Sequence, residues 1–199
     1  MSWVELVLAS ASPRRAALLR ERGYPFRIAP AVHAEPDLRA SGLAPADQAE
    51  ALGYFKARSA SEQLERKRNR LILGADTLVS GGTEVYGKPR DAEDARRILT
   101  ALSGTTHDVI TGVALWSPDD GRRWITHETT RVAMRALSES ELAAYLSSRA
   151  WEGKAGAYGI QDRGDPFVEC IGGSFSNVVG LPVERVAAML SAWGWPDAV

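Results

Sequence analysis

Residues 4–19 read VELVLASASPRRAALL, and they pass from a short apolar run into a segment with serines and two arginines. Residues 4–9 predict a buried strand, because they are few, apolar and partly β-branched. Ser12 suits a helix N-cap, Pro13 the first helical position and Gly23 the end of the helix. The stretch therefore predicts a strand that leads directly into a helix.

The rest of the chain continues this alternation of strands and helices. Further strands are expected over 26–29, 71–80, 109–116, 124–136 and 167–171, and helices over 46–64, 92–102, 142–146 and 183–193. Two adjacent glycines, Gly81 and Gly82, indicate a hairpin turn. Alternating elements are typical of the α/β class, and we expect residues 1–199 to form one domain.

Composition excludes several classes of protein. The formal net charge is −1, so no global field favours nucleic acid or a membrane surface as a partner. The basic run at 65–70 is expected to be a solvated helix end. The single cysteine, Cys170, rules out an internal disulfide framework and suits a reducing cytoplasm. No apolar run reaches the length of a membrane span.

Three polar segments stand out, and the first is the strand-to-helix junction at Ser12. A helix N-terminus presents unpaired N–H groups and partial positive charge, so it attracts anions. Arg14 and Arg15 lie in the first turn, where the helix dipole disfavours cations. A phosphate held there would explain them, whereas the alternative is a simple Ser12 cap with two solvated arginines.

The second polar segment surrounds Asp76, which interrupts an otherwise apolar strand. A carboxylate in that setting needs a cation or a chemical role. If the chain folds back at Gly81, Lys88 returns toward the same end as Asp76. The two residues then form either a metal and phosphate pair or a structural salt bridge.

The third polar segment, residues 153–161, is rich in glycine and alanine and carries Lys154, Tyr158 and Gln161. Small residues let the backbone approach a ligand closely, and the Gln161 amide both donates and accepts hydrogen bonds. A plain surface loop is the alternative. Glu35 lies in another loop, where an acid is usually just solvated.

These segments together resemble one known family. LASASPRRAALL, GADTLV with VYGKPRDAEDARRIL, and WEGKAGAYGIQ with GGSFSNVVGLP occur in the order typical of the Maf family of nucleoside triphosphate pyrophosphatases, from about residue 6 to residue 190. The resemblance implies an elongated mixed sheet with flanking helices, in two lobes around a central cleft. It also implies a homodimer that uses Mg²⁺ or Mn²⁺ to convert a nucleoside triphosphate to the monophosphate and pyrophosphate.

The motifs SPRR, ADT and KAGAYGIQ are typical of the branch that acts on dTTP and UTP. By this resemblance Arg14, Thr77 and Gln161 set the base preference, and Asp76 is the catalytic acid. The other polar cleft positions that it implies are Ser10, Arg15, Glu35, Lys56, Lys88 and Lys154. One alternative is a pyrophosphatase of 7-methyl-GTP, on which a related branch acts, or of another non-canonical nucleotide. The other alternative is a non-enzymatic regulator of septum formation, a process to which the family has been linked.

The resulting hypothesis is attack of water on the α-phosphorus with pyrophosphate leaving. We assign catalysis to Asp76, Lys88 and Glu35. Asp76 either orients the water as a base or holds the cation, and Glu35 would be a second ligand of that cation. Arg15 and Lys56, together with Lys88, would neutralise the triphosphate, and the helix that follows Ser12 would add backbone donors. Substrates would include dTTP, UTP and modified pyrimidine nucleotides.

Overall fold

A computed structural model describes residues 5–65, 69–82, 84–160 and 167–195. Its strands are β1 (Glu5–Leu8), β2 (Arg27–Ile28), β3 (Arg70–Gly81), β4 (Glu84–Tyr86), β5 (Thr106–Trp116), β6 (Arg123–Met134) and β7 (Val168–Gly172). Its helices are α1 (Pro13–Glu21), α2 (Pro45–Ser61), α3 (Ala92–Leu102), α4 (Glu139–Ser148), α5 (Phe175–Val179) and α6 (Val183–Ala192), with a 3₁₀ turn η1 (Ala155–Ala157).

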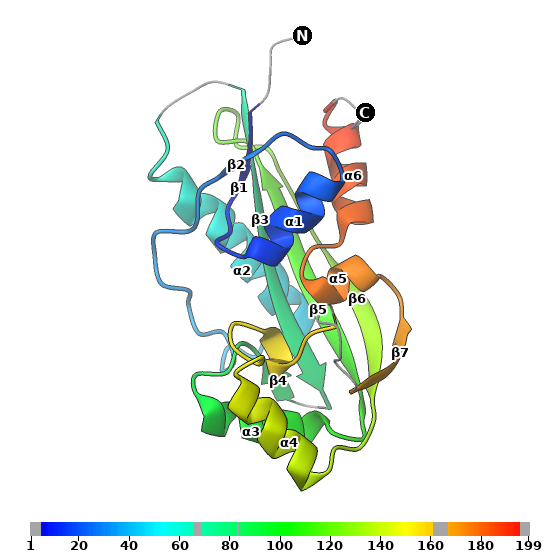
Figure 1. Cartoon of the computed structure of the whole chain (residues 1–199). Coiled ribbons are helices and arrows are strands. Elements are labelled where there is room, and N and C mark those ends of the chain that lie inside the picture. Colours follow the sequence, from blue (N-terminus) through cyan, green and yellow to red (C-terminus); the bar gives the residue numbers. More distant parts are fainter. Residues whose placement is uncertain (1–4, 66–68, 83, 161–166, 196–199) are drawn as a thin grey trace.

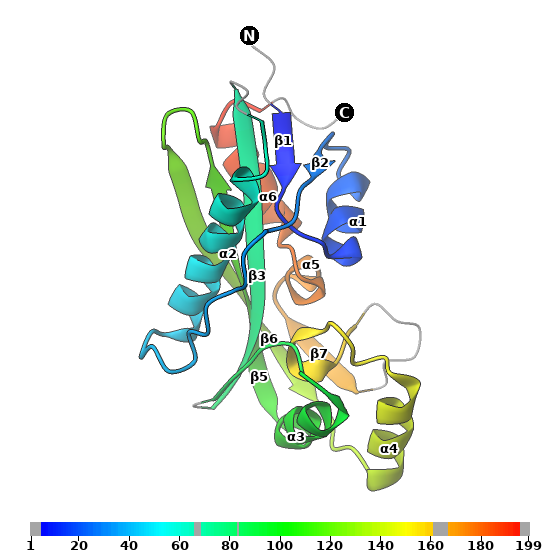
Figure 2. The ribbon, with the colours of Figure 1, turned by 90° about the vertical axis from the view of Figure 1, so that its left-hand side faces the viewer.

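The described strands form one seven-stranded mixed sheet in the order β2–β1–β3–β5–β6–β7, and β4 pairs with β3. β1 runs parallel to both β2 and β3, whereas β3, β5, β6 and β7 pair antiparallel in that order. Helices α1 and α6 lie near one end of the long strands and α3 and α4 near the other (Figure 1). Figure 2 shows α2 on the opposite face of the sheet from α1 and α6. The predicted α/β class with a mixed sheet is confirmed.

The described residues form four hydrophobic clusters: two smaller ones pack α2 on the sheet, and the two larger ones lie at opposite ends of the long strands and explain the elongated shape. One of the larger clusters packs α1 and α6 on the sheet through residues such as Leu19, Leu73 and Leu190. The other packs α3 and α4 on the sheet through residues such as Ile98 and Val109. Because β3 and β5 contribute to both larger clusters, the long strands join two lobes, and polar residues of β3 lie between them.

Local signals in the sequence work as expected at the helix ends. Ser12 Oγ accepts from the Arg15 N–H at 3.5 Å, and Gly23 follows α1 with a φ of 74°. Asp91 caps α3, and Ser138 forms a capping box with Glu141 at the start of α4. These caps pair backbone groups that would otherwise lack a partner.

One sequence expectation was wrong, and one helix was not predicted. Arg70 is not part of a solvated helix end: it begins β3, is 3% exposed, and its Nε donates to Glu5 Oε2 at 2.8 Å. The short helix α5 was not expected, because five residues with a glycine before and after show no helical periodicity. Contacts with residues remote in the sequence therefore determine the structure of both segments.

Helix α2 lies directly on the sheet because glycines leave room for its backbone. A Cβ on Gly112 of β5 would lie 2.1 Å from the carbonyl of Ala49, and one on Gly74 of β3 would lie 2.1 Å from the carbonyl oxygen of Gly53. No real Cβ contact is this short, so α2 would have to move away. This close approach places the side chains of α2 next to β3.

We expect Gly112→Ala to destabilise the fold by about 1–3 kcal/mol, because the added methyl group would displace α2. Thermal unfolding would measure this effect. Gly172→Ala on β7 is the matched control, because its Cβ would meet Arg131 only at 3.9 Å. Equal melting temperatures for the two variants would contradict the close-packing interpretation.

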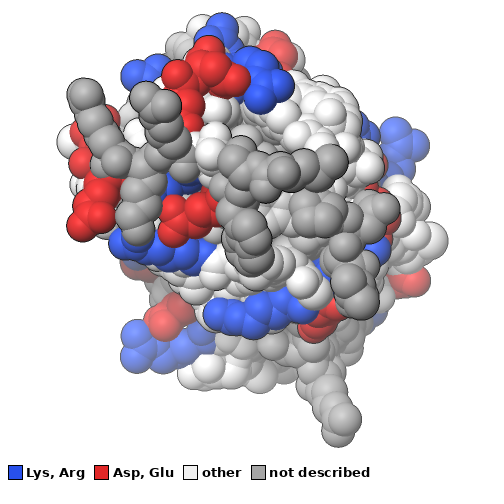
Figure 3. All heavy atoms as spheres, turned by 90° about the horizontal axis from the view of Figure 1, so that it is seen from above, with Lys and Arg blue, Asp and Glu red and all other residues white. Residues whose placement is uncertain are grey.

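Acidic and basic side chains are interspersed on the face seen from above the molecule (Figure 3). Within the described ranges, no helix combines the length and the apolar character needed to cross a bilayer.

Candidate active site

A cavity of about 590 Å³ opens between the two lobes. Its wall is built from the β1–α1 junction, the loop before α2, the middle of β3, and η1 with the residues around it. The predicted site residues that line it are Ser10, Ser12, Arg14, Arg15, Glu35, Lys56, Asp76, Thr77, Lys88 and Lys154. Gln161, the remaining one, lies outside the described residues. Segments far apart in the sequence thus share one cavity.

Lys56 occupies the centre of a charged trio. Its Nζ forms an ion pair with Oδ1 of Asp76 and lies 3.0 Å from Oε1 of Glu35. Lys56 is 5% and Asp76 6% exposed, whereas Glu35 is more open to solvent. Helix α2 supplies the lysine and β3 the aspartate, so the close packing of α2 on the sheet creates the trio. The sequence suggested Lys88 as the partner of Asp76, but this ion pair is made by Lys56.

Arg15 is buried at the start of α1, so the solvated alternative does not apply to it. Its Nε donates to the Gly180 carbonyl at 2.7 Å, and Nη2 donates to Oγ1 of Thr77 at 2.9 Å. A third donor, Nη1, lies 3.4 Å from Oγ of Ser10. Burial lowers the pKa of Arg15 despite the opposing effect of Asp76 and Glu35, yet a guanidinium stays charged at neutral pH.

Arg14 points differently from its neighbour. Its Nη2 donates to the carbonyl oxygen of Gly153 at 2.8 Å, which links α1 to the segment before η1 in the other lobe. This hydrogen bond is exposed, and both residues line the cavity. Arg14 therefore spans the cavity mouth, whereas Arg15 lies within the wall.

Positive charge prevails in the cavity lining. The cationic side chains are Arg14, Arg15, Lys56, Lys88 and Lys154, and the carboxylates are Glu35, Asp76 and Glu152. Desolvation by surrounding protein, and then repulsion from Lys56 and Arg15, lowers the pKa of Lys88. Such crowding of cations is unfavourable by itself and becomes favourable when a polyanion binds.

Among the described residues, no group of three or more His, Cys, Asp or Glu side chains comes together as a metal site. Glu35 and Asp76 nevertheless converge on one point, the Lys56 ammonium. Mg²⁺ is commonly held by one or two carboxylates together with substrate phosphates and water. The donor set therefore fits a cation that binds together with a phosphate ligand.

A family model described as a Maf-like protein matches residues 5–193. The chain belongs to the Maf family. Similar curated proteins include those of Ruminiclostridium cellulolyticum, 45% identical with 93% of this chain and 94% of the relative covered, and Moorella thermoacetica, 45% identical with 96% and 95% covered. The protein of Pelotomaculum thermopropionicum is 42% identical over 96% of this chain and 97% of its own length. Each of these relatives is named dTTP/UTP pyrophosphatase.

Sequence reasoning missed several residues of this Maf chain that lie in or behind the cavity wall. Gly180, just after α5, provides the carbonyl that holds Arg15, and its φ of 125° suits glycine. Asn177 of α5 and Thr111 of β5 are fully buried and hydrogen-bonded. Asn177 and Gly180 lie in the motif GGSFSNVVGLP, which carried only the family resemblance. Thr111 could have been noticed as a polar residue within an apolar strand, since a buried hydroxyl needs a hydrogen-bond partner.

Proposed function

We propose that this chain hydrolyses dTTP, UTP and modified pyrimidine nucleotides to the monophosphate and pyrophosphate. The observation that carries the proposal is the trio of Lys56, Asp76 and Glu35 within a cavity lined by further cations. Such a lining suits a triphosphate, and an acid beside it suits activation of water. The pyrimidine preference is inferred from the relatives, which are dTTP/UTP pyrophosphatases by name.

Phosphoryl chemistry depends on positioning and on neutralising charge at the phosphate oxygens. Arg15 is held by Gly180 and Thr77, so its donors are oriented before substrate arrives. Lys88 and Lys154 act as point charges toward the triphosphate. The N-terminus of α1 adds backbone N–H groups beside them.

In the reaction that we propose, the oxygen of a water molecule forms a bond to the α-phosphorus. The bond between that phosphorus and the oxygen bridging to the β-phosphorus breaks, and pyrophosphate leaves with the electron pair. Asp76 orients the water and accepts its proton, while Lys56 keeps the carboxylate in place. Cations around the cavity stabilise the charge on the leaving group.

Glu35 and Asp76 are the residues that would hold a divalent cation. When bound, Mg²⁺ or Mn²⁺ would neutralise phosphate charge and make the attacking water more acidic. Glu35 also restrains Lys56 at 3.0 Å, so it links the loop before α2 to the floor of the cavity.

A panel of triphosphates tests the function directly. Pyrophosphate and monophosphate would be measured with UTP, dTTP, CTP, GTP and 7-methyl-GTP, in Mg²⁺, in Mn²⁺ and in chelator. We expect UTP and dTTP to react fastest and chelator to abolish turnover. A preference for 7-methyl-GTP would place the chain in the other branch, and no turnover of any triphosphate would overturn the enzymatic assignment.

Lys88 predicts a particular pH dependence of kcat/KM. Only the protonated ammonium attracts phosphate, and its pKa in the free protein is lowered from 10.5. We therefore expect kcat/KM for UTP to fall on the alkaline side at a lower pH than an ordinary lysine would cause. Lys88→Arg should move this decline to higher pH, because arginine stays charged. Identical alkaline limbs for the two proteins would contradict the role of Lys88.

A further inference from the structure

A chain of hydrogen bonds leads from Arg15 into the protein interior. Arg15 Nη2 donates to Thr77 Oγ1 at 2.9 Å, and Thr77 Oγ1 lies 2.9 Å from Thr111 Oγ1. Thr111 Oγ1 in turn donates to the carbonyl oxygen of Asn177 at 3.2 Å. Thr77 lines the cavity, whereas Thr111 and Asn177 are fully buried behind it.

The two ends of this chain determine the direction of every hydrogen bond in it. A guanidinium only donates, and a carbonyl oxygen only accepts. Since the single Thr111 proton goes to Asn177, the Thr77 proton must go to Thr111. Thr77 has then used its only donor, so it offers a ligand in the cavity nothing but a lone pair.

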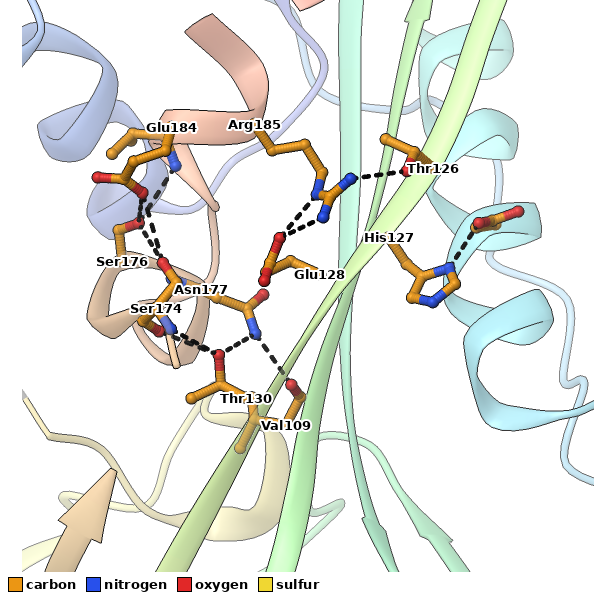
Figure 4. A network of polar contacts seen from close by, with 12 residues as sticks. Val109, Thr126, His127, Glu128, Thr130, Ser174, Ser176, Asn177, Glu184 and Arg185 are labelled. Atoms are coloured by element: carbon orange, nitrogen blue, oxygen red, sulfur yellow. Dashed lines mark hydrogen bonds and ion pairs between the residues drawn. The ribbon is translucent and has the colours of Figure 1, made fainter. Parts of the chain in front are cut away.

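The inner end of the chain is held firmly. Asn177 Nδ2 donates to the Val109 carbonyl at 2.9 Å and to Thr130 Oγ1 at 3.0 Å, as Figure 4 shows. The Asn177 carbonyl also accepts from the Gly180 N–H at 2.9 Å, so it keeps a partner if Thr111 loses its hydroxyl. Removing that hydroxyl should therefore affect Thr77 more than it affects α5.

A group that only accepts cannot hydrogen-bond to a phosphate oxygen, which also accepts, so a direct hydrogen bond between the ligand and Thr77 requires a donor on the ligand. Under the proposed function, the donors common to dTTP and UTP are the N3–H of the base and the 3′-hydroxyl. CTP and UTP have the same sugar and phosphates, but N3 of cytosine carries a lone pair where N3 of uracil carries a hydrogen. Only the base donor would thus allow Thr77 to distinguish these two substrates.

We propose that Thr111 is a positioning residue for base selectivity: it keeps Thr77 an acceptor, which favours the N3–H of uracil or thymine and disfavours the N3 of cytosine. This inference rests on the proposed function. A site arranged to hydrogen-bond one group strongly rejects an analogue that cannot make the bond. Thr111 never touches the substrate and acts only through Thr77.

The test compares Thr111→Val, which keeps the shape but removes the hydroxyl, with Thr111→Ser, which keeps the hydroxyl. Values of kcat/KM would be measured for UTP, CTP and dTTP. In Thr111→Val, the Thr77 proton is free to turn toward cytosine N3, so we expect the UTP to CTP preference to fall roughly 10-fold or more. Thr111→Ser should retain it, and the UTP to dTTP ratio should stay the same in both.

An unchanged UTP to CTP preference in an active Thr111→Val protein would overturn this inference and leave the proposed function intact. A wild-type protein that releases no pyrophosphate from UTP or dTTP would instead overturn the proposed function and this inference with it. If Thr111→Val does not fold, Thr111→Ala removes the same hydroxyl and provides the same comparison. A loss of preference in Thr111→Ser equal to that in Thr111→Val would indicate packing rather than the hydroxyl, and would also overturn the inference.

Discussion

Asp76→Asn is expected to reduce pyrophosphate release from UTP by roughly 10²–10⁴-fold while leaving the protein folded. An amide of the same shape cannot accept the proton of the attacking water, and it is a poorer ligand for a hard cation. Lys56 keeps a charged partner in this variant, because Glu35 lies 3.0 Å from its Nζ. We therefore expect kcat to fall far more than the melting temperature.

Asp108→Asn provides the matched control for this variant. Asp108 lies on the neighbouring strand β5, opposite Ser80 of β3, and its side chain is 40% exposed. It lies 3.7 Å from Arg131, makes no part of the cavity lining, and should tolerate the same chemical change with little effect on turnover. If Asp76→Asn retained activity comparable to that of Asp108→Asn, Asp76 would not be the catalytic acid.

Lys56→Met should produce the second large effect, on both stability and activity. Removing the ammonium leaves Asp76 buried without its cation and lets its charge repel that of Glu35. Loss of one partner of a buried ion pair typically costs about 3–5 kcal/mol. Thermal and denaturant unfolding would measure this loss, and pyrophosphate release should fall as well, since Lys56 positions Asp76.

The double variant Lys56→Met/Asp76→Asn separates these two effects. With both charges removed, the buried site needs no counterion, so we expect much of the lost stability to return. Activity should not return, because the carboxylate is still missing. If the two stability losses simply added, Lys56 and Asp76 would not be energetically coupled, and the ion pair could not be the element that organises the cavity floor.

Much of the fold follows from local patterns. The apolar run before Ser12, the cap at Ser12 and the glycine after α1 all predicted elements that the structure contains. These signals depend on backbone groups within a few residues of each other, so no distant contact is needed to interpret them. The prediction for Arg70 was wrong, and α5 was not predicted, because their environments come from strands and loops that are remote in the sequence.

The candidate site likewise has features that the sequence predicted and features that it did not. Asp76 stood out because a carboxylate in an apolar strand requires a partner, and the hairpin at Gly81 correctly indicated that Lys88 returns toward the cavity. The identity of the partner did not follow, since Lys56 reaches Asp76 only when α2 packs on Gly74 and Gly112. Gln161, assigned to the base by resemblance, remains a prediction.

The sequence by itself determined the strand-to-helix junction, the three polar segments and the family to which they belong, because residue type and spacing carry these signals directly. Only the tertiary structure decided which polar groups are partners: Lys56 lies between Asp76 and Glu35, Arg15 donates to Gly180, and Thr111 lies behind Thr77. The physical reason is that hydrogen bonds and ion pairs act over a few ångströms. Their partners are therefore set by how helices and strands pack, and not by distance along the chain.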